Sequence, residues 1–457
     1  MSSVGFRTIL LQLSLSLCGL QVSAQSFMLL RFDEDYSQLR DSSSKLYHKL
    51  KFLPLAGGKR AYLSFGGEFR QEFGGKIDED WLQDQGYNYS ILQRYSLHTA
   101  IHVSSRLKFF VQLNSAVEEG NKYGSGPTDE DRLNVQNLFG EYKFLKDTLH
   151  QLSFRLGRQE MDYGSGRLIS VRDGNTTRQY FTGTKLCYSA PDFALDAFVM
   201  NADEVQSGLF DNRSSGAKLW GAYSNFKFHN AEHLDLYYLG IKRNQAQFEV
   251  GKGREVRHTL AARYWRKGKG FVYNLEAAYQ FGTFSEKNIS AWTTAIELGY
   301  TFEYLMFKPS VNLRNDYVSG DRKLADGTLQ TFNPLYPKGG YFGFNPLIGP
   351  SNLIDIHPYL LLMITDRLSV QADLIFNWRY AIQDGLYRPG GTFNAAGSGS
   401  RHHYIGTTHL LSADYQFNRH IALSCGGQYF ALGDFLKDIT PHWANAKYFN
   451  AQFSFKF

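Results

Sequence analysis

The chain has 457 residues, of which 16% are aromatic, and it contains 43 glycines but only 11 prolines. Its formal net charge of +6 is small for this length, and without a lysine run or a base-stacking cluster it does not indicate a nucleic-acid partner. Beyond residue 26 the apolar runs are much shorter than the roughly 20 residues of a membrane-spanning helix, which excludes a polytopic helical membrane protein.

Residues 1–24 have the pattern of a secretory signal peptide. Arg7 supplies a positive charge, an apolar stretch follows over residues 9–20, and Val22-Ser23-Ala24 is a small-residue cleavage site before Gln25. A buried N-terminal helix is the alternative interpretation. We therefore expect an exported protein whose residues 25–59 form an N-terminal periplasmic segment.

The last twelve residues alternate between apolar and polar side chains, and the chain ends on Phe457. Successive side chains of a strand point to opposite faces, so this segment has one apolar and one polar face. An ordinary half-buried strand gives the same pattern, but so does a transmembrane barrel with lipid outside and water inside. The apolar face is formed by Phe449, Ala451, Phe453, Phe455 and Phe457, and the other by Tyr448, Asn450, Gln452, Ser454 and Lys456.

The same alternation recurs along the chain and predicts eighteen strands. An even number of strands is typical of bacterial outer-membrane barrels. The predicted strands are 60–74, 88–103, 106–116, 136–146, 151–159, 179–189, 192–201, 217–228, 233–243, 254–266, 270–283, 289–302, 306–317, 354–364, 367–381, 403–417, 420–431 and 445–457.

The connections between these strands alternate in length. Short ones such as 104–105, 190–191 and 365–366 alternate with long ones at 117–135, 160–178, 202–216, 318–353 and 382–402. Barrels with both termini in the periplasm have short periplasmic turns and longer outer loops, which a periplasmic sandwich or propeller does not need. We therefore predict an all-β fold, a single 18-stranded antiparallel transmembrane barrel over residues 60–457.

The polar strand faces predict the charges that line the lumen. Acidic side chains nearly balance the basic ones, so composition alone does not establish charge selectivity. For each basic residue, an ion pair that braces the wall across strands is the alternative to a role in the pore. The basic candidates from strand faces are Arg70, Arg94, Lys108, Arg155, Arg257, Arg263, Arg314 and Arg379.

Four segments in a fixed order resemble the alginate export family of outer-membrane barrels. Individually they are modest motifs, but together they cover the chain from about residue 60 to its end. They are Gly157-Arg158-Gln159-Glu160 with Tyr163-Gly164, Gly166-Arg167-Leu168, Arg172-Asp173 and Arg178; the segment 332–343; the segment 349–358; and Trp378-Arg379 with Asp384-Gly385-Leu386-Tyr387.

The resemblance implies an 18-stranded barrel that passes a polysaccharide or another solute through an arginine-rich constriction. It makes Arg158, Arg167, Arg178 and Arg379 candidate cations of the pore or its loops, because guanidinium groups suit carboxylates. Ion pairs of Arg158 and Arg167 within their own loop are the alternative. Strand parity puts Arg158 on the apolar face, so a bulge or an early strand end is needed to turn it inward.

The chain departs from the family at its periplasmic side. Alginate exporters can carry a long periplasmic turn that plugs the pore, whereas the corresponding turn here, 418–419, has two residues. We therefore do not expect plugging by that turn. The outer loop 318–353 is the longest connection and contains four prolines, and it is a candidate to fold inward as a constriction; the sequence does not decide whether it occludes the lumen.

The sequence predicts no catalytic group, metal site or cofactor. His402, His403 and His409 lack further ligands at metal-binding spacing, and Ser165 lacks the G-x-S-x-G context of a nucleophile. An outer-membrane enzyme with its site at the barrel mouth and a loop-closed receptor or adhesin nevertheless stay as alternatives to a channel.

The sequence thus favours a passive channel in the bacterial outer membrane. The barrel is expected to be a monomer surrounded by outer-membrane lipid, and a periplasmic secretion partner is a further candidate. The expected cargo is an anionic solute, above all an acidic polysaccharide such as alginate or its oligomers. The candidate anion-binding residues are Arg70, Arg94, Arg158, Arg167, Arg178, Arg257, Arg263, Arg314 and Arg379.

Overall fold

The computed structural model describes residues 27–41, 46–55, 61–78, 86–126, 128–440 and 444–457. It divides into two compact units, Met1–Asp35 and Tyr36–Phe457. The described part of the first unit contains the 3-10 turn η1 (Arg31–Asp33), where Arg31 pairs with Glu34 at 2.7 Å. The predicted signal peptide lies outside the described residues. None of the helices in the described ranges has the length and hydropathy to cross a membrane.

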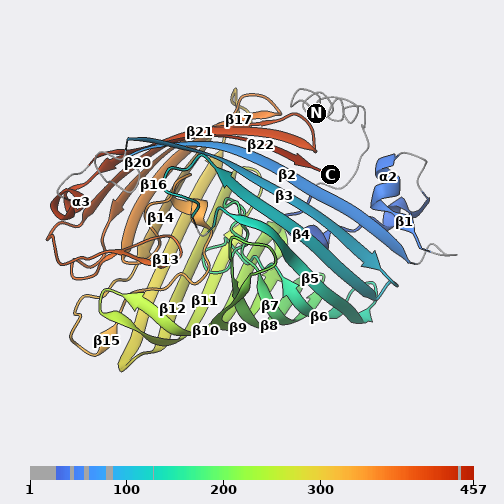
Figure 1. The fold of residues 1–457 in the computed structure, drawn as a ribbon, viewed down its shortest axis with the longest axis horizontal. Helices are drawn as coiled ribbons and strands as arrows, with labels where there is room; N and C mark the ends of the chain where they lie inside the picture. Colours follow the sequence, from blue (N-terminus) through green and yellow to red (C-terminus); the bar gives the residue numbers. More distant parts are fainter. Residues whose placement is uncertain (1–26, 42–45, 56–60, 79–85, 127, 441–443) are drawn as a thin grey trace. The chain divides into compact units, whose positions relative to one another are not determined.

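The second unit is a closed antiparallel barrel of 18 strands, as the alternation predicted (Figure 1). Each predicted strand overlaps one observed strand. The barrel strands are β2 (Tyr62–Ile77), β3 (Tyr87–His102), β4 (Leu107–Glu119), β5 (Asp131–Lys146), β6 (Gln151–Gln159), β7 (Phe181–Ala190), β8 (Phe193–Glu204), β9 (Arg213–Lys227), β10 (Glu232–Phe248), β11 (Gly251–Arg266), β12 (Phe271–Phe284), β13 (Lys287–Thr301), β14 (Ser310–Val318), β16 (Leu353–Met363), β17 (Leu368–Trp378), β20 (Tyr404–Gln416), β21 (Ile421–Leu432) and β22 (Ala446–Lys456).

The first and last barrel strands close the ring. β2 and β22 pair from Glu68 with Lys456 to Ile77 with Lys447, and Figure 1 shows these blue and red strands side by side. The predicted alternation of the last strand is confirmed there: Phe449 is 51% exposed on the outer face, whereas Tyr448 points inward and donates a hydrogen bond to Glu72. The wall therefore has an apolar outer surface and a polar inner one.

Short turns lie at one end of the barrel, the periplasmic end in barrels of this type, and most long connections lie at the other. Two outer connections are shorter than predicted. β10 and β11 continue to pair past a register shift between Arg243 and Ala246, so residues 249–250 alone connect them. β12 and β13 pair to Phe284 and Lys287, which leaves a turn at residues 285–286.

Short elements occupy the chain before the barrel. They are the 3-10 turn η2 (Ser37–Asp41), helix α2 (Leu46–Lys51) and strand β1 (Leu53–Pro54), which pairs with the start of β2. Lys51 is fully buried near the inner face of β2, and the Arg419 guanidinium lies 4.8 Å from the Tyr47 ring centroid. From Tyr36 onward, the described residues of this stretch therefore belong to the same compact unit as the barrel.

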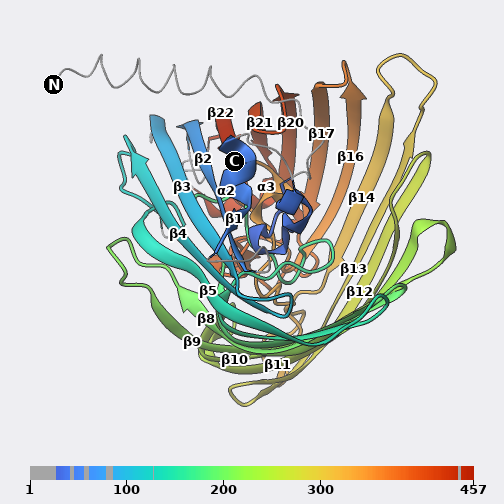
Figure 2. The same cartoon turned by 90° about the vertical axis from the view of Figure 1, so that its right-hand side faces the viewer.

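The remaining short elements lie in turns and loops. They are η4 (His229–Ala231), β15 (Thr328–Leu329), η5 (Gly339–Phe342), β18 (Leu386–Tyr387), β19 (Phe393–Ala395) and α3 (Asp434–Ile439). β15 adds a short parallel pairing to β13 beyond the end of β14. Figure 2 shows loop segments running within the ring of strands.

Candidate functional site

Residues 160–180, which connect β6 to β7, cross the lumen. On one side, the backbone oxygens of Asp173, Gly174 and Asn175 accept hydrogen bonds from arginines of β2 and β3. On the other side, Arg167 reaches Asp316 of β14 at 2.5 Å. β14 lies six strands from β2 around the ring of 18, so this connection forms a bar across part of the pore.

A cluster of three arginines and two acids holds the β2–β3 end of the bar. Arg70 donates to the backbone oxygens of Asp173 and Asn175, both at 2.6 Å. Arg94 bridges the carboxylates of Glu68 at 2.7 Å and Asp173 at 2.9 Å. Arg178, at the C-terminal end of the same bar, lies 3.5 Å from Asp173. Burial alone would raise the pKa of Asp173, but Arg94, Arg178 and Arg70 outweigh it and hold that pKa well below its usual range.

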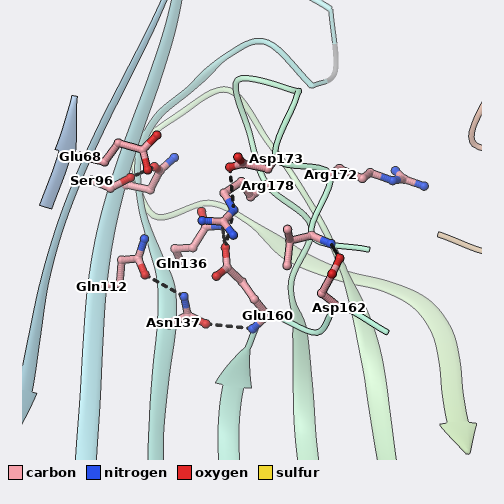
Figure 3. Close-up of polar contacts among 12 residues, drawn as sticks. Glu68, Ser96, Gln112, Gln136, Asn137, Glu160, Asp162, Arg172, Asp173 and Arg178 are labelled. Atoms are coloured by element: carbon pink, nitrogen blue, oxygen red, sulfur yellow. Dashed lines mark hydrogen bonds and ion pairs between the residues drawn. The ribbon is translucent and has the colours of Figure 1, made fainter. Parts of the chain in front are cut away.

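A second set of hydrogen bonds fixes the start of the bar (Figure 3). Glu160 accepts from Gln136 at 2.8 Å and pairs with Arg178 at 3.1 Å. Its backbone N–H donates to Asn137, which in turn donates to Gln112. All these side chains are buried, so their mutual hydrogen bonds satisfy groups that would otherwise be costly to desolvate.

The other outer loops also fold inward. Within residues 319–352, Asn333 donates to both oxygens of Glu255 on β11 at 3.1 Å, and Gln428 of β21 accepts the backbone N–H of Phe344. These loops and the bar form an apolar core inside the barrel, which agrees with the predicted inward folding of loop 318–353. Its loop members include Leu168, Ile169, Phe332, Leu335, Phe342, Leu347, Ile348 and Leu386.

Cavities remain beside this core. A small one of about 20 Å³ lies between the loops and the wall and is lined by Arg167, Glu276 and Lys338, among others. That volume is room for a single water. A larger one of about 320 Å³ lies at the periplasmic ends of β11–β14 and includes Arg263 and Glu297 in its lining.

Most predicted pore arginines pair with acids or with backbone oxygens of the chain. Arg167 contacts Asp316 and Glu276, and Arg379 donates to the backbone oxygens of residues 382, 384, 397, 400 and 402. The remaining pairs are Arg257 with Glu255 at 2.6 Å, Arg263 with Asp235 at 2.9 Å and Arg314 with Glu297 at 2.8 Å. These arginines therefore form the contacts within the chain that were the alternative to a role in the pore.

Arg158 stays on the outer face of the wall. A bulge or an early strand end was needed to turn it inward, but β5 and β6 pair without a shift from Leu138 with Arg158 to Lys143 with Ser153. Arg158 instead donates to the backbone oxygen of Val135 and lies 3.9 Å from Asp203. The inward orientation assumed for this residue is therefore corrected.

Two loop cations without acidic partners were not among the sequence candidates. Arg172 belongs to the bar and Lys338 to loop 319–352, and among the described residues neither lies within ion-pair distance of a carboxylate. Figure 3 shows Arg172 directed away from the Asp173 cluster. Its guanidinium lies 5.8 Å from the Tyr336 ring, and Arg243 of β10 lies 5.9 Å from the same ring.

The charge of Arg172 persists at neutral pH. Burial and the nearby Arg243 lower its pKa to about 10, while Tyr336 acts in the opposite direction. Both Arg172 and Lys338 occur in the family motifs, as Arg172-Asp173 and Pro337-Lys338. The family motifs could therefore have identified these two cations from the sequence, whereas strand parity gives no information on residues in loops.

Comparison with known proteins identifies the family. The family model for alginate export matches residues 61–450. The chain belongs to the alginate export family. A search of curated proteins finds no match. Family and fold together place the protein in the bacterial outer membrane as a β-barrel channel for solutes.

Solved structures with the same fold include proteins of Pseudomonas aeruginosa. OccK8 (OprE) has a TM-score of 0.58 at 11% identity, over 86% of this chain and 98% of that one. OccD3 (OpdP) has a TM-score of 0.57 at 12% identity, over 90% and 94%. OccK2 (OpdF), solved in complex with glucuronate, has a TM-score of 0.56 at 10% identity, over 86% and 98%. At these identities the likeness establishes the fold alone.

Proposed function

We propose that this protein is a passive outer-membrane channel for an anionic solute, with an acidic polysaccharide such as alginate, or its oligomers, as the foremost cargo. The observation that carries the proposal is the pair of loop cations, Arg172 and Lys338, that lack a carboxylate partner among the described residues. An ion pair formed within the chain neutralises a wall arginine, whereas a cation without one attracts anions from solution.

The chemistry of these groups fits a uronate. A guanidinium presents a planar, permanently charged fork to a carboxylate, and Tyr336 beside Arg172 adds an aromatic surface. Weak sites in series allow an ion to enter and leave. The structure of OccK2 in complex with glucuronate supports the proposal, because a barrel of the same fold forms a complex with a uronate. We also propose that the barrel is a monomer, as predicted from the sequence.

The test is single-channel recording of the refolded mature protein in a planar bilayer, with a KCl gradient across it. We expect a stable conductance, a reversal potential that favours chloride, and block by polyuronate from either side. Neutral dextran of equal length is the control for block by size alone. Cation preference, or block by dextran and polyuronate alike, would contradict the proposal.

A loop-closed receptor or adhesin is the second candidate, because an apolar core of loop residues lies inside the barrel. It predicts no conductance from a protein that is folded and inserted, as judged by its heat-dependent mobility in gels. It also predicts that deletion within residues 319–352 opens the pore. Conductance of the unaltered chain would exclude it.

A further inference from the structure

We propose that Arg172 is the residue that sets the anion preference of the channel, and that Arg70, Arg94 and Arg178 act by positioning it rather than by contacting the solute. This inference rests on the proposed function and deepens it. Of these four arginines, one contacts the solute and the other three anchor the loop. The solute group recognised by Arg172 is a carboxylate.

The tip of the bar is a short, closed turn. The backbone N–H of Gln179 donates to Val171 at 2.9 Å and closes its base, and the N–H of Asn175 donates to Arg172 at 3.0 Å within it. Inside this turn the backbone oxygens of residues 173–175 point to the wall, where Arg70 and Arg94 hold them. Figure 3 shows that the side chain of Arg172 extends the other way.

Arg172 adopts a conformation that needs support from its surroundings. Its φ is +54°, in the left-handed region, which is unfavourable for a non-glycine residue. The support comes from both sides of the residue: Asp173 is held by the wall arginines, and the Arg172 Nε donates to the backbone oxygen of Pro337 at 3.2 Å. The wall-side support therefore comes from Asp173 and the backbone oxygens that follow it.

The anchoring arginines already have oxygen partners. Arg70 donates to three backbone oxygens, and Arg94 to two carboxylates as well as to backbone oxygens. Arg172 differs, because within the described residues its side chain contacts the Pro337 oxygen and the Tyr336 ring but no carboxylate. Its terminal nitrogens are therefore the donors with capacity for a solute carboxylate.

The first test replaces Arg172 with Gln and records the reversal potential in a KCl gradient. One unit charge acting at ~6 Å in water favours chloride and disfavours potassium by roughly threefold each, so its removal changes the chloride-to-potassium permeability ratio by roughly tenfold. We expect that loss of anion preference in Arg172→Gln, with weaker block by polyuronate and glucuronate. Arg132→Gln is the matched control, because Arg132 is 69% exposed and pairs with Glu130, so removing its charge leaves the ratio unchanged.

Asp173→Asn tests the positioning role through the sign of the effect. Removing an acid from the lumen increases anion preference if charges act only through space. If Asp173 positions Arg172, its loss instead reduces anion preference, and adding Arg172→Gln causes no further reduction. Increased anion preference in Asp173→Asn would overturn the positioning role.

Arg70→Lys provides a second test without any change of charge. One ammonium cannot reproduce the fork that holds three backbone oxygens, so the tip loosens and anion preference falls by a factor approaching that of Arg172→Gln. An unchanged permeability ratio in both Arg70→Lys and Arg172→Gln, in a channel that is itself anion-selective, would overturn the inference but not the proposed function. Absence of anion selectivity in the unaltered protein would overturn both.

Discussion

Arg379 is expected to lock loop 379–403, and Arg379→Lys measures how strongly. The guanidinium is fully buried, donates to five backbone oxygens of this loop and lies 3.8 Å from the Phe435 ring centroid. Lysine has three donors on one atom, so at least two buried oxygens lose their partner. At about 1–1.5 kcal/mol each, the opening free energy of the loop falls by about 2–3 kcal/mol.

The assay is amide hydrogen exchange of the protein in detergent micelles. Exchange of the loop amides of Arg388 and Gly391, which are hydrogen-bonded within the loop, should accelerate on the order of 100-fold, while strand amides keep their rates. Arg322→Lys is the matched control: Arg322 is exposed and contacts Tyr380 nearby, so a change of no more than about twofold is expected. Unchanged loop exchange in Arg379→Lys, or equal acceleration throughout the barrel, would refute the reasoning.

Three further predictions concern the same loops and the wall. Burial raises the pKa of Asp384 and of Asp321 to about 6, so the folded loops bind protons more tightly than the unfolded chain. The stability that this binding gives the loops is lost as the pH rises from about 4 through 6. Loop 379–403 should therefore resist protease better at about pH 5 than at pH 8, and the difference should be smaller in Asp384→Asn. Asn333→Ala leaves Glu255 without two hydrogen bonds and should cost about 1–3 kcal/mol of loop stability, seen as faster cleavage within residues 319–352 and as open-channel noise. Gly282→Ala should lower the temperature at which the barrel unfolds in gel-mobility assays, because Gly282 has a φ of +136° and a Cβ there would lie 2.1 Å from a backbone oxygen of the neighbouring strand; an unchanged transition would contradict this.

The wall of the barrel was predictable from the sequence because its signal is local. Two-residue alternation assigns each side chain to a face without knowledge of its neighbours, and the pattern of β22 was read correctly down to Phe449 and Tyr448. The outer turns at 249–250 and 285–286 were missed for a related reason. There the strands extend past the point where alternation is clear, since pairing with the next strand, rather than side-chain pattern, sustains them.

The partners of the pore arginines were not predictable in the same way. Arg94 meets Asp173, and Arg167 meets Asp316, across long stretches of chain and from different elements. Alternation assigns Arg94 to the lumen correctly, but whether its charge stays available depends on which loop folds over it. For Arg158 the strand pattern was right, and the bulge assumed in order to bring it inward is absent.

These contacts explain why the near balance of charged residues on the strand faces says little about selectivity. The wall arginines contact carboxylates and backbone oxygens of the chain, and an anionic saccharide likewise offers carboxylates and other oxygen acceptors. Carboxylates and backbone oxygens of the loops therefore fix the constriction by pairing with wall arginines. Wall acids are likewise neutralised by cations of the chain. In the proposed channel, selectivity then depends on the loop cations that lack a carboxylate partner among the described residues. A change of one residue at Arg172 should consequently matter more to permeation than the loss of a paired arginine of the wall such as Arg263.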